Sequence, residues 1–454
     1  MPHIVTQPCC SDGSCVYSCP VNCIHPSPDE PGFAAAEMLY IDPAACVDCG
    51  ACVTACPVGA IRPDSALTAG QLPFVAVNAA HYPPRPAGVK LPPPLKLAPV
   101  PPAPRIRRRG LTVAVVGSGP AGMYAADELL SQDGVRVNVF DKLPTPYGLV
   151  RAGVAPDHQG TKSISRLFDR ISRTDGFSFY LNVEVGKHLS HSELLAHHHA
   201  VIYAVGAPGD RRLDLDGMGM PGTGTATEAV AWINGHPGFA GRPIDLHHRR
   251  AVVIGNGNVA LDVARILTAD PESLADTDIS DAALQALRSS AVREVVVAAR
   301  RCPADSAFTL PELIGLTTTA EVVLDAADHA LVGADLQTCR DPGVRAKLEV
   351  LAALPEAATA GTSGRRIRLA YRLTPRRITG AGRARGVTFT RTGTAAEVSL
   401  EAGLVLSSIG YRGAPIGGLP FDEDTAVVPN VAGRVVDPST GSPVSGAYVA
   451  GWIK

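Results

Sequence analysis

Cysteine spacing near the N-terminus is the strongest chemical signal in the sequence. Four cysteines and a proline follow one another as C-x2-C-x2-C-x3-C-P, at Cys46, Cys49, Cys52, Cys56 and Pro57. Thiolates are soft ligands that select iron–sulfur clusters or zinc, and this compact run is typical of iron–sulfur clusters. Structural zinc sites usually divide their ligands into two separate pairs. The spacing therefore predicts a 4Fe–4S cluster, with zinc as the less favoured alternative.

A second copy of this pattern lies upstream, with one ligand type changed. When the two copies are aligned by their C-x3-C-P ends, Asp12 takes the second ligand position. In two-cluster proteins with this motif, the fourth cysteine of each copy ligates the other cluster. We therefore expect cluster A on Cys9, Cys15 and Cys56, with Asp12 beside its fourth iron. We expect cluster B on Cys46, Cys49, Cys52 and Cys19.

The carboxylate makes cluster A the weaker of the two. A carboxylate is a hard ligand and holds a thiolate-preferring iron poorly. Cluster A should therefore persist as 3Fe–4S, or as a labile 4Fe–4S cluster with Asp12 or water bound. Cys10 competes with Cys9 for the first ligand position, and both alternatives stay open. Cys23 is a spare cysteine that we expect to be a small buried residue.

A nucleotide-binding fingerprint follows in the middle of the chain. The apolar, β-branched residues 111–116 predict a strand that runs into Gly117, Gly119 and Gly122, and a helix should extend to about residue 130. The first glycine allows a tight turn, the second allows the backbone to approach a pyrophosphate, and the third allows helix and strand to pack closely. Asp141 closes the next expected strand, where an acid binds a ribose 2′-hydroxyl and repels a 2′-phosphate. This site suits FAD or NAD.

A second fingerprint has the opposite charge at its ribose position. Residues 251–254 lead into Gly255, Asn256 and Gly257, and the matching strand at 294–299 ends in Arg300 and Arg301. Two guanidiniums at this position suit the 2′-phosphate of NADP(H), although a surface arginine pair is the alternative. Two folds with different ribose contacts indicate two different nucleotides, FAD and NADP(H).

Composition limits the class of protein. A chain of 454 residues should fold as two or three domains. The net charge of −2 argues against nucleic acid as a partner, and no apolar run of 18 residues indicates a membrane span. Seven of the 11 cysteines stand in ligand spacing within the first 56 residues and need a reducing compartment. We therefore expect a cytoplasmic protein without membrane or nucleic-acid partners.

The motifs resemble a known family. The first 82 residues resemble the seven-iron ferredoxins, although the gap between Cys9 and Cys15 is shorter. From residue 111 onward the chain is similar to the adrenodoxin-reductase type of ferredoxin–NADP reductase. The motifs that carry this resemblance lie at 115–121, 143–151, 153–158, 204–207, 254–265 and 451–454. The whole chain resembles the fused ferredoxin/ferredoxin–NADP reductases of actinobacteria.

The resemblance implies an α/β flavoprotein with two Rossmann-like dinucleotide-binding domains, preceded by an α+β bacterial-type ferredoxin domain. We expect the ferredoxin domain at 1–82, a proline-rich linker at 83–109, the FAD domain at 110–210 and 401–454, and the NADP domain inserted at 211–400. Residues 38–41 and 74–77 should be short strands beside the clusters. Four arginines between 105 and 109 form either a solvated edge or a basic patch facing the ferredoxin domain.

The resemblance also implies site residues, which join those of the fingerprints. The expected FAD contacts are Gly117, Gly119, Ala121, Gly122, Asp141, Leu149, Val183, Gly451 and Trp452. The expected NADP contacts are Arg211, Gly255, Asn256, Gly257, Asn258, Val259, Arg300, Arg301 and Glu312. His158 could relay a proton near the flavin or be structural. Relatives can carry a second glutamate one turn after Glu312, where this chain has Gly315.

These features predict an oxidoreductase that transfers electrons between NADP(H), FAD and iron–sulfur clusters, with a ferredoxin or another one-electron acceptor protein as partner. The family continues beyond the last motif with a segment that closes over the flavin, so the stop at Lys454 predicts a fragment or a truncated product. The alternatives are an electron-delivery subunit, an inactive truncated product and a disulfide reductase. The last is disfavoured because only Cys302 and Cys339 follow residue 56.

Overall fold

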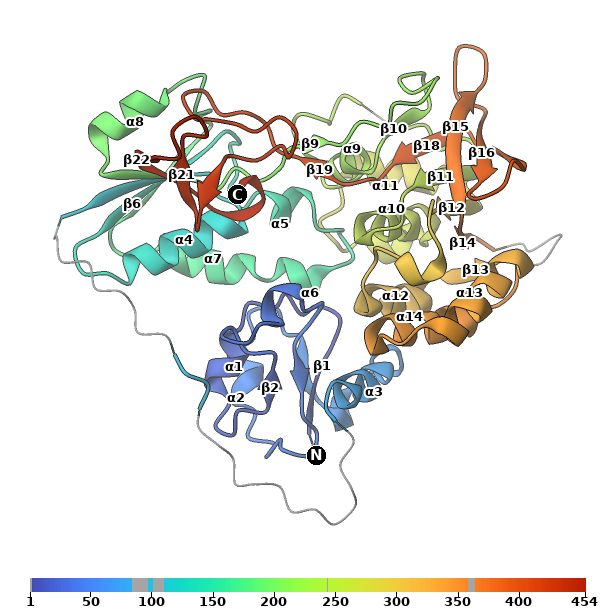
Figure 1. Cartoon of the computed structure of the whole chain (residues 1–454), viewed down its shortest axis with the longest axis horizontal. Coiled ribbons are helices and arrows are strands. Elements are labelled where there is room, and N and C mark those ends of the chain that lie inside the picture. The colour runs from blue at the N-terminus through green and yellow to red at the C-terminus, as the bar shows by residue number, and fades with distance from the viewer. Residues whose placement is uncertain (1, 84–96, 101–109, 243, 358–363) are drawn as a thin grey trace. The chain divides into compact units, whose positions relative to one another are not determined.

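The chain folds into two compact units. The computed structural model describes residues 2–83, 97–100, 110–242, 244–357 and 364–454. The first unit comprises residues 1–100, 155–161 and 212–409, and the second comprises residues 101–154, 162–211 and 410–454 (Figure 1). The expected arginine run at 105–109 and most of the expected linker lie outside the described residues. None of the helices in the described part of the chain is long and apolar enough to cross a membrane.

The N-terminal segment, residues 2–83 of the first unit, is built from two similar β-α-β halves. The halves are β1 (His3–Val5), α1 (Ser14–Ser18) and β2 (Ile24–His25), then β3 (Tyr40–Ile41), α2 (Ala51–Ala55) and β4 (Ile61–Pro63). Strand β1 pairs with β4 and β2 pairs with β3, both antiparallel. Each helix follows a glycine with positive φ, Gly13 at 82° and Gly50 at 73°. The internal repeat expected from the cysteine motifs is thus a repeat of structure.

Helix α3 (Pro73–Ala80) holds the two halves together. The side chain of Asn78, which is completely buried, binds Val5 through both its N–H and its C=O and accepts a hydrogen bond from Ile41 N at 2.9 Å. The strand that we expected at residues 74–77 is not formed. Pro73 is favoured in the first helical turn, and Phe74 and Asn78 lie one turn apart on the buried face. The buried residues of this stretch therefore recur with the period of a helix and not with the alternation of a strand.

A parallel sheet forms the centre of the rest of the first unit. Its order is β10 (Thr223–Thr225), β18 (Leu404–Ser407), β11 (Arg250–Ile254), β12 (Glu294–Ala298), β14 (Arg366–Ala370) and β13 (Glu321–Leu324). The helices of this part are α9 (Ala226–Ile233), α10 (Asn258–Thr268), α11 (Asp281–Arg288), α12 (Leu310–Thr319), α13 (Ala326–Thr338) and α14 (Pro342–Ala352) (Figure 1). Strands β15 (Leu373–Thr379), β16 (Gly386–Arg391) and β17 (Glu397–Glu401) form a small antiparallel sheet.

Strand β18 corrects one expected boundary. We expected residues 401–454 to belong to the FAD domain, but β18 pairs in parallel with β10 and β11. The reason is its apolar composition, since all four of its residues are buried between neighbouring strands. The chain therefore leaves the first unit after residue 409. Residues 155–161, expected within the FAD domain, also belong to the first unit.

The second unit contains a seven-stranded sheet. Its order is β20 (Asn430–Val431), β21 (Arg434–Val436), β22 (Pro443–Val449), β8 (Ala200–Tyr203), β5 (Thr112–Val116), β6 (Arg136–Asp141) and β7 (Phe177–Leu181). The helices are α4 (Pro120–Leu130), α5 (Leu149–Ala152), α7 (Ser165–Ser172) and α8 (His191–His197), and α6 (Gln159–Lys162) spans the boundary with the first unit. Strands β9 (Gly209–Asp210) and β19 (Tyr411–Arg412) pair separately. The last strand, β22, thus returns beside β8 in the sheet where the first fingerprint begins.

A buried carboxyl in α13 makes the stability of the first unit depend on pH. Asp328 is 3% exposed and accepts a hydrogen bond from Tyr371 N at 3.1 Å. Burial, and then the charge of Asp325, raises the pKa of Asp328 to about 6. Because this value lies above the pKa of an unfolded aspartate, about 3.9, the carboxyl contributes stability below about pH 4 and loses it as the pH rises through 6.

We expect Asp328→Asn to keep the hydrogen-bond acceptor for Tyr371 N and to abolish the loss of stability at high pH. The substituted chain should gain up to about 3 kcal/mol over the unsubstituted chain at pH 8 and almost nothing at pH 4. Denaturant midpoints at the two pH values measure the difference. Asp276→Asn, at an exposed aspartate of the same unit, is the control. Equal pH dependence of the Asp328→Asn chain and the unsubstituted chain would contradict the assignment.

Candidate functional site

The cysteines expected for cluster B lie around one small cavity in the N-terminal segment. Its lining includes Cys19 from the first motif and Cys46, Cys49 and Cys52 from the second, together with Cys23. Cys19 arrives there because α1 ends at Ser18 and the chain continues with extended backbone at Cys19, the C-cap of the helix. The Sγ atoms of Cys19 and Cys23 are 3.4 Å apart. Cys23, expected only as a small buried residue, is therefore a direct neighbour of an expected ligand.

The residues expected for cluster A also lie near one another. Burial, and then the charges of Cys9, Asp12 and Cys56, raises the pKa of Cys15. Cys10 belongs to the same group, since desolvation and then the charges of Asp12 and Cys9 raise its pKa to about 12. The structure thus brings the four expected residues of this cluster near one another. Cys10 lies beside them, so Cys9 and Cys10 both remain candidates for the first ligand position.

This donor set fits metal clusters better than a single zinc ion. Crowded thiols raise one another's pKa, and bound metal cations remove that cost by favouring the thiolates. Sulfurs around one tetrahedral zinc would be about 3.8 Å apart, given a Zn–S bond of about 2.3 Å. Within the described residues, no three cysteine sulfurs lie within 4.8 Å of one another. This wider spacing suits a larger iron–sulfur core.

In the second unit, the first fingerprint forms the turn between β5 and α4. Gly117 has a φ of 103°, and a Cβ there would lie 2.4 Å from the carbonyl oxygen of Ala204. A Cβ at Gly122 would lie 1.9 Å from the carbonyl oxygen of Gly117. At Gly119, by contrast, a Cβ would meet no described atom within 4 Å. Gly117 and Gly122 build the tight turn, and Gly119 leaves open space at the N-terminus of α4 for a pyrophosphate.

The other expected FAD residues surround this turn within the second unit. The Asp141 carboxylate, at the end of β6, accepts hydrogen bonds from Ser118 N at 2.8 Å and from Leu143 N at 2.9 Å. Val183 N donates to the Asp141 carbonyl at 2.9 Å. A Cβ at Gly451 would lie 2.8 Å from the Cβ of Ala121, so the end of the chain reaches the fingerprint helix.

Two large apolar side chains of the second unit face solvent. Leu149 is 44% exposed and Trp452 is 56% exposed. The Trp452 ring lies 5.0 Å from the ring of Tyr411. Trp452 was expected to lie against the flavin, and its open aromatic face fits a flat aromatic ring. Leu149 was expected to contact FAD through its backbone.

The second fingerprint repeats this construction in the first unit. Gly255 has a φ of 114°, and a Cβ there would lie 2.0 Å from the carbonyl oxygen of Ser408. A Cβ at Gly257, before α10, would meet no described atom within 4 Å. The Nδ2 atom of Asn256 is buried without a hydrogen-bond partner among the described residues. A bound nucleotide would satisfy this donor, so the residues fit the ligand.

The two arginines after β12 are free to bind an anion. Arg300 and Arg301 are exposed, and only their carbonyl oxygens are engaged, by Thr392 Oγ1 at 2.9 Å and by Arg372 N at 3.1 Å. Within the described ranges, neither guanidinium forms an ion pair. Arg211, expected to contact NADP, lies in the second unit and donates its N–H to the Gly410 carbonyl at 2.9 Å.

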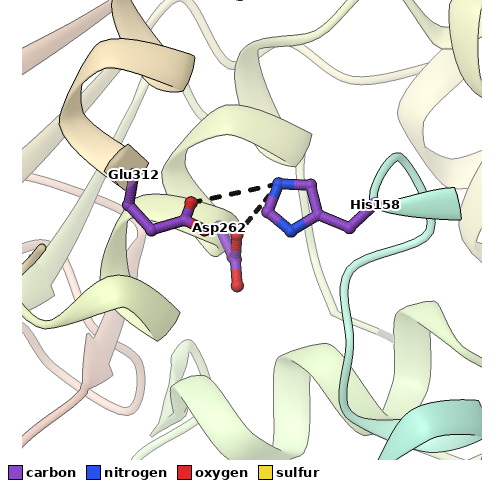
Figure 2. A group of neighbouring side chains, drawn as sticks. All are labelled: His158, Asp262 and Glu312. Carbon is purple, nitrogen blue, oxygen red and sulfur yellow. Dashed lines mark ion pairs between the residues drawn. The ribbon is translucent and has the colours of Figure 1, made fainter. Parts of the chain in front are cut away.

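His158 belongs to a charged cluster in the first unit, half-buried around the buried Arg265, that the sequence did not indicate. Its Nε2 lies 4.0 Å from Asp262 Oδ1 and 3.9 Å from Glu312 Oε2 (Figure 2). Arg265, 4% exposed, donates from Nη2 to His158 Nε2 at 2.8 Å and to Asp262 at 2.6 Å. It also binds Asp157 with two hydrogen bonds. The available signal was the spacing of Asp262 and Arg265, three residues apart on an otherwise apolar helix.

Charge compensation explains this cluster without a metal ion. Burial works to raise the pKa of Asp157, but the hydrogen bonds and charge of Arg265 outweigh it and lower that pKa. Burial, and then the charge of Asp262, raises the pKa of Glu312. The guanidinium already supplies a cation among the three carboxylates. The Nη2 atom of Arg265 can only donate, and it lies within hydrogen-bond distance of His158 Nε2 as well as of the Asp157 and Asp262 carboxylates.

Two of the three consecutive histidines at 197–199 form hydrogen bonds within the second unit. His198 is half-buried and lies 2.8 Å from the Leu194 carbonyl and 2.9 Å from Asn138 Nδ2. His199 accepts a hydrogen bond from Thr112 N at 3.1 Å.

Comparisons with known proteins agree with the fold. Residues 39–62 match the family of 4Fe-4S binding domains, and residues 111–294 match the pyridine nucleotide-disulphide oxidoreductase family. A solved structure of Mycobacterium tuberculosis FprA in complex with NADPH has a TM-score of 0.70 at 40% identity, covering 76% of this chain and 79% of that chain. The α/β flavoprotein fold with a ferredoxin-like N-terminal segment is confirmed.

Curated relatives extend the likeness to the whole chain. The NADPH-ferredoxin reductase FprA of M. tuberculosis (strain ATCC 25618 / H37Rv) is 42% identical over 365 residues, which are 75% of this chain and 78% of that protein. The probable ferredoxin/ferredoxin–NADP reductase of the same strain is 70% identical over 458 residues, which cover 100% of this chain and 80% of the relative. This chain therefore belongs to the family of ferredoxin/ferredoxin–NADP reductases.

Proposed function

We propose that the chain is an NADPH-dependent flavoprotein reductase that moves electrons between NADP(H), FAD and iron–sulfur clusters. The observation that carries this proposal is the contrast between its two dinucleotide folds. One presents the carboxylate of Asp141 at the end of its second strand, and the other presents the exposed Arg300 and Arg301. A carboxylate accepts from ribose hydroxyls and repels a 2′-phosphate, whereas paired guanidiniums bind one.

The chain's own residues bind and orient the two nucleotides. The glycine turns and the N-termini of α4 and α10 would hold the pyrophosphates. We assign the FAD contacts to Gly117, Gly119, Ala121, Gly122, Asp141, Leu149, Val183, Gly451 and Trp452. We assign the NADP contacts to Arg211, Gly255, Asn256, Gly257, Asn258, Val259, Arg300, Arg301 and Glu312. When bound, FAD supplies the exchange between two-electron and one-electron transfer.

His158 is the proposed proton carrier of the site. Its Nε2 lies 2.8 Å from Arg265 Nη2, a contact that holds one edge of the ring in place. The surrounding carboxylates and Arg265 keep the ring in one orientation. This role is supported by the burial of the cluster, in which His158, Asp262 and Glu312 have side chains 18%, 14% and 15% exposed.

For the iron–sulfur part, we propose a 4Fe–4S cluster B held by Cys19, Cys46, Cys49 and Cys52. We propose a 3Fe–4S or labile 4Fe–4S cluster A held by Cys9, Cys15 and Cys56 beside Asp12. The partner would be a ferredoxin or another protein that accepts single electrons. Since the ligands must stay thiolates, we place the protein in the cytoplasm.

Electron flow within the chain can be measured by anaerobic titration with NADPH. We expect the flavin absorbance to bleach first and the cluster absorbance to fall next, because the flavin passes single electrons on. Dithionite, which reduces the clusters chemically, is the control. Flavin bleaching that leaves dithionite-reducible clusters oxidised would contradict electron transfer to the chain's own clusters.

The choice of coenzyme should depend on the arginine pair. A hydrogen bond to a charged group is worth about 1.5–3 kcal/mol, so Arg300→Ala with Arg301→Ala should raise the KM for NADPH tenfold or more. The KM for NADH should change little. Arg376→Ala with Arg377→Ala, at an exposed adjacent pair on β15, is the matched control. The assignment fails if the first double variant still prefers NADPH as strongly as the unsubstituted chain.

The identity of the fourth ligand decides the state of cluster A. Asp12→Cys supplies a thiolate at the second position of the first motif, so we expect a stable 4Fe–4S cluster. The 3Fe paramagnetic signal of the isolated protein should disappear. Ser65→Cys adds a thiol at an exposed position of the same segment, outside both cysteine motifs, and should leave the signal unchanged. Persistence of the 3Fe signal in Asp12→Cys would refute the ligand set.

A further inference from the structure

Helix α12 of the first unit is held at its N-terminus by the N-terminal segment. The carboxylate of Glu37 accepts a hydrogen bond from Leu310 N at 2.8 Å, at the first residue of the helix. The same carboxylate binds Lys347 Nζ at 2.7 Å, and this ammonium also donates to the Phe308 carbonyl at 3.1 Å. A carboxylate at a helix N-terminus is favourable because the first N–H groups lack partners within the helix. The N-terminal segment thus fixes where α12 begins.

One turn further along α12, the absence of a side chain makes room for a second contact. A Cβ at Gly315 would lie 2.3 Å from both Nε2 and Oε1 of Gln7. The Gln7 amide therefore lies directly on the helix backbone, in a space that only glycine leaves open. From there Gln7 Nε2 donates to Glu312 Oε2 at 3.2 Å. The N-terminal segment contributes a polar group to the charged cluster around His158.

This contact is the shortest that the described residues give to the Glu312 carboxylate. Glu312 Oε2 lies 3.9 Å from His158 Nε2 and 3.9 Å from Arg265 Nη1. Arg265 Nη1 is buried and has no hydrogen-bond partner among the described residues. An unpaired buried donor beside a carboxylate favours a direct bond, so something must hold Glu312 away from it. Gln7 is the group in position to do so.

Helix α12 also adjoins the second fingerprint. Asn258, the first residue of α10, accepts a hydrogen bond from Thr309 N at 2.9 Å and donates to Thr309 Oγ1 at 3.3 Å. Thr309 in turn caps α12 through Glu312 N. A shift of α12 would therefore reach the turn at which the nucleotide is proposed to bind.

We propose that Gln7 is a positioning residue of the reductase site, which holds the Glu312 carboxylate toward the nucleotide and away from Arg265. The inference rests on the proposed function, because it assigns Glu312 to the NADP site. It makes the N-terminal segment part of the proposed NADP site as well as the carrier of the clusters. Gln7 lies two residues before Cys9, so one short loop serves both purposes.

A double-mutant cycle between two residues 308 positions apart tests this role. Gln7→Ala removes the donor, and Gly315→Ala places a methyl group where the amide lies. We expect each substitution in the full chain to lower the rate of flavin reduction by NADPH about tenfold, the value of one bond to a charged group. The dissociation constant for NADP+, set by the arginine pair, should change less than about twofold. The double variant should be no slower than either single variant.

Two further variants separate the hydrogen bond from packing. Gln7→Glu keeps the shape of the side chain but replaces the donor with an acceptor, so it should slow flavin reduction at least as much as Gln7→Ala. Gln71→Ala removes a glutamine of the same segment that binds Thr68 N, and should have no effect. Alanine favours helix over glycine, so Gly315→Ala in the Gln7→Ala background should not lower the unfolding temperature.

The outcomes distinguish this inference from the proposed function. Additive rate effects, or an unchanged rate in Gln7→Glu, would overturn the positioning role while NADPH still reduced the flavin. Failure of NADPH to reduce the flavin of the unsubstituted chain would overturn the proposed function and, with it, the inference.

Discussion

A buried guanidinium is the interaction on which the candidate site depends. Arg265 joins three stretches of the first unit: the loop with Asp157 and His158, helix α10 through Asp262, and helix α12 through Glu312. Removing one partner of a buried ion pair leaves an uncompensated charge, which is far more costly than losing an exposed pair. The three carboxylates can therefore share one small volume only while the guanidinium is present. This constraint fixes the position of His158 beside Arg265 and the carboxylates.

The two units solve the same steric problem in the same way. At Gly117 and at Gly255, a strand turns into a helix so close to a neighbouring backbone carbonyl that no side chain fits. The neighbour is Ala204 in the second unit and Ser408 in the first. Each turn leaves an open helix N-terminus, and the difference between the two sites comes from the end of the adjacent strand. In the proposed function, one aspartate or two arginines at that place give the two folds opposite preferences for a phosphate.

Local patterns predicted most of the fold. The glycine fingerprints, the apolar strands before them and the cysteine repeat are short-range signals with one physical explanation each, and the elements formed where we expected them. The prediction of a strand at 74–77 was wrong. Its β-branched residues alternate as they would in a strand, but Pro73 and the buried Asn78 favour a helix. The boundary near residue 401 was missed because β18 is a buried parallel strand, and such a run does not reveal which sheet it joins.

The candidate site was only partly predictable for a related reason. Most of its proposed nucleotide-binding residues lie within contiguous motifs, but Arg265 and Gln7 contact residues far away in sequence. A buried arginine in an apolar helix indicates that an acidic partner lies nearby, but it does not identify that residue. Nothing in the residues around Gln7 indicates Gly315 as the position that receives it, because that match is one of shape between distant surfaces.

The long separation of these contacts has a consequence for biosynthesis. Gln7 and Glu312 are 305 residues apart, and Glu37 and Lys347 are 310 apart. At a ribosomal rate of about 5–20 residues per second, the N-terminal segment is made about 15–60 s before α12 exists. During that interval, the residues of the segment that later contact α12 lack that helix as a partner. The segment must therefore persist in the nascent chain without the contacts that Gln7 and Glu37 make in the finished protein.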